Sequence, residues 1–284
     1  MINNNINNNN ANIDTLCLSC GGTKCISMLG ALKYVEENIF DINKIKKYYG
    51  TSGGAIINYL LIIGYNIDEI YEFIFELELS KLIDSKLDID NFINNKGISN
   101  GYKFIYVLKK LLYNKIKKTS ITFIELFNLY NKELYIFGTN FTKGIEICFS
   151  HINHPNMDIF LALRITISMP YMLYPVIINN EYYLDGAITN SFPIDYCNQD
   201  NTIGIFIKYH IQNNFINFFD IYVKSLDILC DIVVENKINN YKNIITIMSD
   251  SKNNIKGITN LNIDKKYKQY LFELGYNCAK IHYS

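Results

Sequence analysis

This 284-residue sequence lacks an excess of charge of either sign. Its 27 lysine and arginine residues balance its 27 aspartate and glutamate residues, so the formal net charge is zero. A chain without an excess positive field cannot hold a polyphosphate backbone by releasing its counterions. Nucleic acid is therefore not expected as a partner, and nothing in the composition identifies a protein partner.

Tryptophan is absent and arginine nearly so. Arg164 is the one arginine beside 26 lysines, and Asn, Ile, Lys and Tyr are abundant. This composition is typical of AT-rich coding, so lysine-rich or asparagine-rich patches carry little functional information. Arg164 has two interpretations: its planar guanidinium makes contacts that lysine cannot reproduce, or it was left by drift.

Cysteine is too sparse for a disulfide framework. The seven cysteines are odd in number and scattered, whereas small secreted domains carry dense, even sets. Reduced thiols in a cytoplasmic protein fit this pattern better. Cys17 and Cys20 form a C-x-x-C, but residues i and i+3 of a strand point to opposite faces, and no second pair has ligand spacing. We expect no metal site.

Long apolar runs are missing as well. Residues 56–64 form an apolar stretch about half as long as the ~18 residues that span a bilayer. Residues 1–12 are mostly asparagine and lack the apolar core and cleavage site of a secretory signal, so we expect a disordered tail there. The expected location is cytoplasmic, with any membrane contact peripheral.

Two β-turn-α units follow this tail. The first has an apolar strand at 16–18, a Gly-Gly turn and apolar residues at helical spacing to about Glu37. The second has a strand at 45–49, a glycine-rich turn at 50–54 and an apolar helix at 55–63. Such units in series favour a mainly parallel sheet covered by helices, so the expected fold class is α/β.

Later segments carry weaker patterns. We expect helices over 68–79 and 104–116, a loop or cap over 80–101, paired strands at 133–139 and 145–149, and further strands at 182–184 and 202–208. Residues 13–210 are expected to form the catalytic domain. Residues 211–284 are expected to be a helical extension packed on it. Lysines flank the 104–116 helix, which suits either an anionic membrane surface or, more simply, a solvated face.

The segment Gly50-Thr51-Ser52-Gly53-Gly54 has the form G-x-S-x-G between a predicted strand and a predicted helix. Such an elbow holds the serine hydroxyl clear of the sheet and needs small neighbours for steric reasons. A purely structural glycine turn is the alternative. A serine nucleophile needs a base, yet none of the four histidines lies beside an obvious catalytic loop. Asp185 is the candidate, because it follows an apolar strand and begins the tight turn Asp185-Gly186-Ala187.

Four ordered blocks resemble the signature segments of patatin-like phospholipases. The glycine block is Leu18-Ser19-Cys20-Gly21-Gly22-Thr23-Lys24-Cys25, and the elbow at 50–54 is the second block. The third is an R-x-S-x-S-x-P-like segment from Arg164 to Pro170. The fourth is Asp185-Gly186-Ala187, followed by Asn190 and Pro193. The resemblance covers about residues 14–208.

The resemblance implies a three-layer α/β/α fold related to α/β hydrolases and a Ser-Asp dyad without histidine. Ser52 is then the nucleophile, Asp185 the general base, and backbone N–H groups of Gly21, Gly22 and Thr23 the oxyanion hole. Nine residues support these motifs: Cys20, Lys24, Cys25, Gly50, Gly53, Gly54, Gly186, Ala187 and Arg164. The implied activity is hydrolysis of fatty-acyl esters of phospholipids, of phospholipase A or lysophospholipase type, through an acyl-Ser52 intermediate and without cofactor. Other acyl-ester lipids also fit.

Cys20 and Cys25 depart from this pattern, because the family has glycine at both positions. A side chain at position 20 restricts φ, whereas position 25 opens a helix, where a small buried residue is tolerated. Two alternatives therefore stay open. One is a catalytically inactive lipid-binding or scaffold protein on the same fold, and the other is an acyltransferase.

Overall fold

The computed structural model describes residues 13–83, 89–209, 218–249 and 263–284. Residues 1–12, for which we expect a disordered tail, lie outside this part of the chain. The strands are β1 (Thr15–Leu18), β2 (Lys47–Thr51), β3 (Gly97–Ser99), β4 (Glu133–Asn140), β5 (Ile145–Phe149), β6 (Tyr171–Leu173), β7 (Val176–Ile178), β8 (Glu181–Asp185), β9 (Thr202–Tyr209) and β10 (Ile244–Ser249). The helices are α1 (Ile26–Asn38), α2 (Gly53–Ile62), α3 (Ile67–Glu76), α4 (Ile89–Asn95), α5 (Tyr102–Ile116), α6 (Phe123–Tyr130), α7 (Ile159–Thr166), α8 (Phe218–Ile238) and α9 (Lys265–Tyr283).

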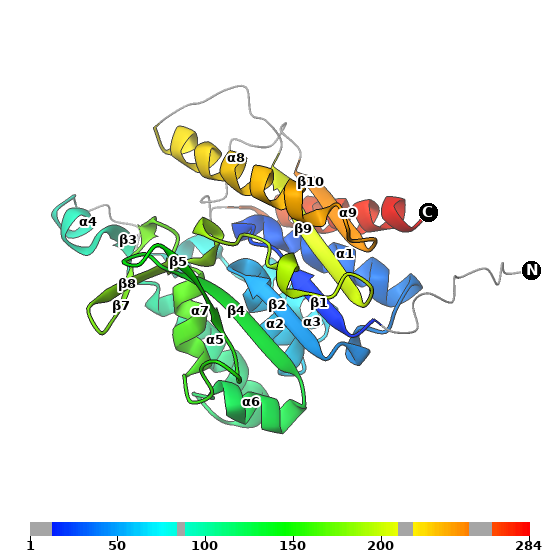
Figure 1. The fold of residues 1–284 in the computed structure, drawn as a ribbon, viewed down its shortest axis with the longest axis horizontal. Helices are drawn as coiled ribbons and strands as arrows, with labels where there is room; N and C mark the ends of the chain where they lie inside the picture. Colours follow the sequence, from blue (N-terminus) through cyan, green and yellow to red (C-terminus); the bar gives the residue numbers. More distant parts are fainter. Residues whose placement is uncertain (1–12, 84–88, 210–217, 250–262) are drawn as a thin grey trace, which may run out of the picture.

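The main sheet has the strand order β10-β9-β1-β2-β4-β8-β7, and β5 pairs with β4 (Figure 1). Its first five strands run parallel, whereas β5, β7 and β8 join as antiparallel neighbours. The central strand β1 is buried along its whole length, as expected for a strand covered on both faces. The expected α/β class with a mainly parallel sheet is confirmed.

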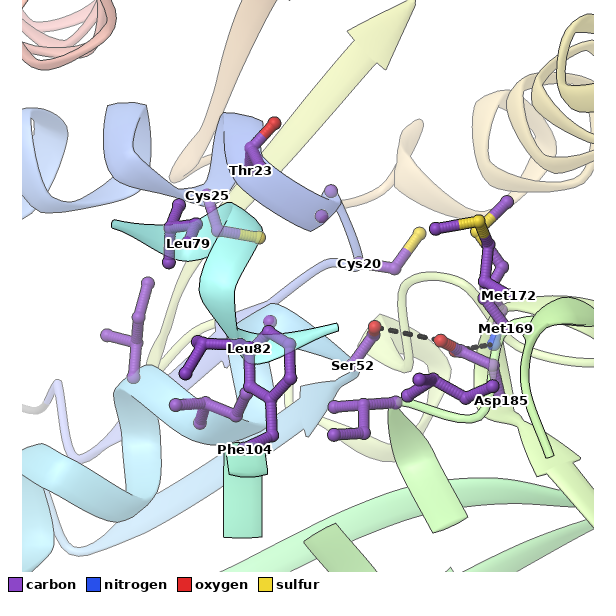
Figure 2. Close-up of a pocket in the computed structure, with 18 of the residues that line it drawn as sticks. Cys20, Thr23, Cys25, Ser52, Leu79, Leu82, Phe104, Met169, Met172 and Asp185 are labelled. Atoms are coloured by element: carbon purple, nitrogen blue, oxygen red, sulfur yellow. Dashed lines mark hydrogen bonds between the residues drawn. The ribbon is translucent and has the colours of Figure 1, made fainter. Parts of the chain in front are cut away.

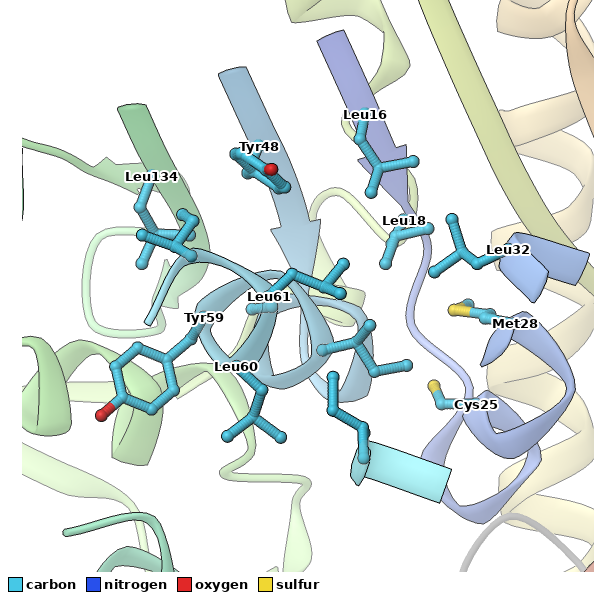
Figure 3. Close-up of a cluster of buried hydrophobic side chains, with 14 of the residues drawn as sticks. Leu16, Leu18, Cys25, Met28, Leu32, Tyr48, Tyr59, Leu60, Leu61 and Leu134 are labelled. Carbon is cyan, nitrogen blue, oxygen red and sulfur yellow. The ribbon is translucent and has the colours of Figure 1, made fainter. Parts of the chain in front are cut away.

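Alternate residues of the central strands enter two different cores. On one face Leu16, Leu18, Tyr48 and Leu134 pack with α1 and α2, as Figure 3 shows. On the other face Cys17, Tyr49 and Tyr135 belong to a smaller cluster that includes Val234 of α8. The period of two in a strand produces this division. The sheet therefore lies between a thick helical layer and a thinner layer to which α8 belongs.

The C-terminal region differs from the expected helical extension. Residues 244–249 form β10, which pairs in parallel with β9 and is the edge of the sheet. The alternating apolar residues of this strand are few and lie between asparagine-rich stretches, which hid them in the sequence. Residues 211–284 thus include part of the sheet as well as helices.

Other expected elements differ in detail. The 80–101 segment, expected to be a loop or cap, contains α4 and β3, and β3 pairs with β6 in a second, two-stranded sheet. Helices α6 and α7 were not predicted. Both are short, eight residues each, so their helical period has little room to emerge. None of the helices in the described part of the chain combines the length and apolar content needed to cross a bilayer.

Helix α9 is held against the rest of the fold by close packing and by hydrogen bonds. It crosses α1 so closely that a Cβ on Gly275 would lie 1.7 Å from the Ser27 carbonyl oxygen, and a Cβ on Gly30 would lie 1.9 Å from that of Phe272. In addition, the buried Lys268 Nζ donates to the carbonyl oxygens of residues 74, 75 and 77, at 2.8, 3.0 and 2.6 Å. These are the last carbonyls of α3, which have no partner within that helix.

We predict that Gly275→Ala destabilises the protein, although glycine-to-alanine changes inside helices usually stabilise them. The added methyl group would meet backbone on α1, so the helices must separate, at a cost of about 1–3 kcal/mol in the free energy of unfolding. Denaturant unfolding measures this cost. The exposed Asn277→Ala on the same helix is the matched control and should leave stability unchanged or slightly higher. Equal stability of Gly275→Ala and the native protein would contradict this close helix crossing.

Candidate active site

Ser52 lies at a strained elbow between β2 and α2. Its φ of 54° and ψ of −123° are rare for a residue with a side chain. The neighbouring glycines are needed sterically: a Cβ on Gly54 would lie 2.5 Å from the Ser19 carbonyl oxygen, and one on Gly50 would lie 2.7 Å from the Ala55 nitrogen. The sequence therefore adopts the strand-elbow-helix geometry that the G-x-S-x-G pattern predicts.

Threonine hydroxyls brace this elbow from both sides. The Ser52 N–H donates to Thr166 Oγ1 of α7 at 2.8 Å, and Thr166 in turn donates to the Phe137 carbonyl of β4. On the other side, Thr51 Oγ1 donates to the Asn190 carbonyl at 2.8 Å. Sequence analysis did not single out the threonines. Only the position of Thr166 inside the Arg164-to-Pro170 segment signalled it.

Asp185, the last residue of β8, meets Ser52 across 133 residues of sequence. Ser52 Oγ donates to Asp185 Oδ2 at 2.9 Å, as Figure 2 shows. The other carboxylate oxygen accepts the Ala187 N–H at 2.9 Å. The Asp185 backbone is held in turn by the Ser168 carbonyl at 3.0 Å and by Thr139 Oγ1 at 2.9 Å. The two residues expected to form the dyad are therefore in hydrogen-bond contact.

Gly186 allows this turn to lie against the sheet. A Cβ at position 186 would lie 2.4 Å from the Phe137 carbonyl oxygen, so any side chain there would push the turn off β4. The N–H of Ala187, which binds the carboxylate, would move with it. Both residues thus position Asp185 through the backbone.

Burial governs the electrostatics of the pair. Ser52 is 9% exposed and Asp185 is 5% exposed. Loss of hydration raises the pKa of Asp185 to about 7, although the hydrogen bonds from Ala187 and Ser52 act in the opposite direction. The carboxyl group is thus divided between its two protonation states near neutral pH. A carboxylate in this range is a much stronger base than an exposed aspartate.

The glycine block adjoins Ser52. It forms the 3-10 helix η2 (Gly22–Cys25), and Gly21, Gly22 and Thr23 line the same pocket as Ser52 and Asp185. Gly22 has a φ of 52°, which suits glycine. As the first residues of this turn, Gly22 and Thr23 carry N–H groups that have no acceptor within it. The side chain of Thr23 points away from Ser52, so its N–H is the group available to the pocket (Figure 2).

The two cysteines that replace glycine do not strain this block. Cys25 has helical φ and ψ of −58° and −15°, and Cys20 is not among the described non-glycine residues with positive φ. Cys25 fills the space beside the elbow, where a Cβ on Gly53 would lie 2.5 Å from its sulfur. Cys20 lines the pocket, whereas Cys17 lies in the core, so the C-x-x-C thiols do not share a site. Lys24 is buried.

Arg164 acts as a clamp outside the reacting groups. Its Nε donates to the Asn100 carbonyl at 2.8 Å, one terminal nitrogen donates to the Tyr174 carbonyl at 2.8 Å, and the other donates to Ser168 Oγ. Burial lowers the pKa of Arg164 to about 10. Three acceptors in one plane favour the first interpretation of this single arginine, since the point charge of lysine cannot serve all three. The carbonyl of the clamped Ser168 accepts the Asp185 N–H.

An apolar pocket of about 230 Å³ opens over Ser52 and Asp185. Most of its lining is aliphatic or aromatic and comes from separate elements, including α2, α3, α5 and α8. Representative lining residues are Ile56, Leu60, Phe73, Phe104, Met169 and Leu226. Ser52 and Asp185 are therefore polar groups at the base of a mostly apolar pocket, and such a lining suits a long acyl chain.

None of the histidines in the described part of the chain lines this pocket. Its lining includes none of His151, His154 and His282, and His210 lies outside the described residues. Across that same part of the chain, no three His, Cys, Asp or Glu side chains are grouped as a metal site requires.

Several lysines of helix α5 make contacts within the fold. Lys115 pairs with Glu69 at 3.4 Å and lies over the Tyr65 ring, while Lys109 lies over the Phe160 ring. Its apolar face, with Leu108, Leu111 and Leu112, is buried. These contacts favour the simpler interpretation of the lysines as part of a packed and solvated helix.

Comparisons of sequence place the chain among lipid hydrolases. The family model described as patatin-like phospholipase matches residues 16–197. The chain is 32% identical over 285 residues to the uncharacterised protein R571 of Acanthamoeba polyphaga mimivirus, covering 94% of this chain and 93% of that protein. It is 34% identical over 203 residues to the probable lipid hydrolase 463L of invertebrate iridescent virus 6, covering 70% of this chain and 65% of the relative.

Two solved structures share the fold. VipD from Legionella pneumophila superimposes with a TM-score of 0.58 at 17% identity, covering 96% of this chain and 67% of VipD. The type III effector ExoU superimposes with a TM-score of 0.55 at 16% identity, covering 96% of this chain and 53% of ExoU, so the chain spans about half of that effector. The four sequence blocks, the fold and the match over residues 16–197 agree: this chain belongs to the patatin-like phospholipase family.

Proposed function

We propose that the protein hydrolyses fatty-acyl esters of phospholipids or lysophospholipids, with Ser52 as nucleophile and Asp185 as general base. The observation that carries this proposal is the 2.9 Å hydrogen bond from Ser52 Oγ to a buried carboxylate at the floor of an apolar pocket. A serine hydroxyl is a poor nucleophile unless an adjacent group takes its proton. Here that group is aspartate, and the reaction needs no histidine.

The proposed reaction has two halves. Asp185 takes the Ser52 proton as Oγ attacks the ester carbonyl carbon, and the carbonyl oxygen becomes an oxyanion. When the tetrahedral intermediate collapses, the bond to the leaving alcohol breaks and Asp185 returns the proton to that alcohol. Water then attacks the acyl-Ser52 ester in the same way, giving its proton to Asp185. The fatty acid leaves and Ser52 regains its proton.

The remaining residues orient these groups. The backbone N–H groups of Gly21, Gly22 and Thr23 are proposed to donate to the oxyanion, a type of contact typically worth about 10²–10³ in rate. Ala187, through its N–H, fixes one carboxylate oxygen so that the other faces Ser52. Arg164 and Ser168 position the Asp185 backbone without touching the substrate. This chemistry uses no metal or organic cofactor.

The backbone geometry also bears on the two alternatives. An inactive lipid-binding protein was suggested by Cys20 and Cys25, but neither position has a conformation that needs glycine. The intact contact between Ser52 and Asp185 favours an active enzyme over that alternative. Transfer of the acyl group to an acceptor other than water uses the same residues, and analysis of products with and without an added lysolipid separates the two reactions.

Labelling with a fluorophosphonate tests the nucleophile. We predict that the probe adds its mass to the native protein at Ser52, and that Ser52→Ala abolishes both labelling and activity, with a rate loss of about 10³ or more. The exposed Ser284→Ala is the control and should label like the native protein. A folded native protein that resists the probe would argue against the enzymatic proposal.

The pH dependence of the rate tests the base. With Asp185 titrating near 7, kcat/KM should rise with pH, with an apparent pKa of about 7, because only the ionised carboxylate accepts the Ser52 proton. Below that pH the rate should fall about tenfold per unit as the carboxylate is protonated. An apparent pKa near that of an exposed aspartate, about 4, would contradict a dehydrated base.

The same titration predicts a stability difference. Burial raises the pKa of folded Asp185 above its unfolded value, so its contribution to stability is present at low pH and is lost as pH rises through about 7. Asp185→Asn removes this charge. The variant should be inactive, yet more stable than the native protein at pH 8 by on the order of 2–4 kcal/mol, with the difference shrinking toward pH 4. Denaturant unfolding at both pH values measures it, and a difference independent of pH would contradict the assignment.

A further inference from the structure

Helix α8 is joined to the loop that carries Asp185. Its Leu226 and Cys230 line the pocket, and Val234 is buried. The Cys230 thiol donates to the Ala187 carbonyl at 3.4 Å. Further along, Lys237 Nζ donates to Asp195 Oδ1 at 2.8 Å and to Asn190 Oδ1 at 3.1 Å. One face of α8 is therefore a wall of the pocket, fixed at two points to the segment after Asp185.

The opposite face of α8 is apolar and exposed. Five large side chains on it are between 46% and 62% exposed: Ile221, Ile228, Leu229, Ile232 and Val233. At 100° per residue they fall on one arc together with Ser225 and Asn236, and the sequence places no Asp, Glu, Lys, Arg or His on this arc. We call this arc the α8 stripe. It extends over about 18 Å of helix.

A further apolar side chain is exposed at the rim of the pocket, next to α8. Ile188 lies in the 3-10 helix η5 (Gly186–Ile188), which packs against α8. Ile188 lines the pocket and is also 38% exposed, so apolar surface of the pocket reaches the exterior of the molecule at this point. In Figure 1, α8 lies along the upper side of the molecule beside β10, and Ser52 directly follows the carboxyl end of the parallel strand β2.

We propose that the α8 stripe docks on the acyl-chain layer of a lipid surface and sets the mouth of the pocket against it. The proposal rests on the proposed function, because a lipid substrate resides in such a surface. An exposed apolar face beside a pocket marks an interaction site. An uncharged helix face suits insertion into the boundary between head groups and acyl chains, where each buried side chain adds favourable transfer free energy.

The lack of charge on the α8 stripe predicts which lipid surfaces it binds. The chain has no net charge, and the α8 stripe has no Asp, Glu, Lys, Arg or His, so attraction to anionic head groups does not contribute to this docking. Binding should therefore be similar on neutral and anionic vesicles and insensitive to salt. The lysines of α5, the other membrane candidate in the sequence, are engaged with neighbouring rings and carboxylates.

A matched pair of variants tests the docking. Ile232→Asp places a charge in the α8 stripe, whereas Ile152→Asp makes the same change at a side chain of similar exposure, 65% against 55%. Position 152 follows β5 and neighbours α6, at the opposite end of the sheet. With phosphatidylcholine vesicles in a flotation assay, we expect Ile232→Asp to lower partitioning about tenfold or more and Ile152→Asp to leave it unchanged. Hydrolysis of vesicle phospholipid should fall in parallel, while kcat/KM for a monomeric short-chain ester stays constant.

Three outcomes would overturn the docking proposal, and a fourth would overturn only the proposed function. Unchanged partitioning of Ile232→Asp, or equal losses in both variants, would overturn the proposal. So would a native dimer that Ile232→Asp dissociates without changing vesicle binding, since the stripe would then be an interface between copies. A native protein that hydrolyses no ester, while Ile232→Asp still loses vesicle binding, would overturn the proposed function and leave the docking intact.

Discussion

The hydrogen bond between Ser52 and Asp185 is the contact on which the site depends, and the fold meets several separate conditions to make it. The serine must lie at positive φ, and the aspartate must end a strand that runs antiparallel to β4. Thr166 and Thr139 then hold the two backbones on opposite sides of the same strand. Because these groups are buried, each donor and acceptor needs a partner, and a shift of any element would leave one unpaired.

Two features of this site lower the stability of the folded protein. The positive φ of Ser52 costs on the order of 1–3 kcal/mol of folding free energy. Burial also removes water from Asp185, which destabilises the charged form of its carboxyl group. Hydrogen bonds from Ala187 and Ser52 offset only part of this cost, since the pKa of Asp185 still rises to about 7. The same burial that disfavours the ion makes it a stronger base. Reduced stability at neutral pH and the greater basicity of Asp185 thus have one physical origin.

Local patterns predicted the turns of the site better than the elements that surround them. The elbow, the glycine block and the Asp185 turn were predictable because their geometry restricts residues within a few positions. Thr166, Arg164 and α8 contact segments that are distant in sequence, and spacing along the chain does not identify those partners. Cys20 illustrates the converse error. The pattern expected glycine there, but the requirement applies only at positive φ, which Gly22 has and Cys20 does not.

The match to the family ends at residue 197, whereas the pocket does not. Leu226 and Cys230 complete its wall from α8, and Lys268 of α9 binds the carbonyls where α3 ends and the pocket-lining segment 77–83 begins. The motifs that form the contact between Ser52 and Asp185 lie inside the matched region. The wall of the pocket is completed by a helix outside it. Helix α8 touches the Asp185 loop with one face and exposes the other, so under the proposed docking a change in its exposed face would alter access of lipid to Ser52 and leave the contact between Ser52 and Asp185 unchanged.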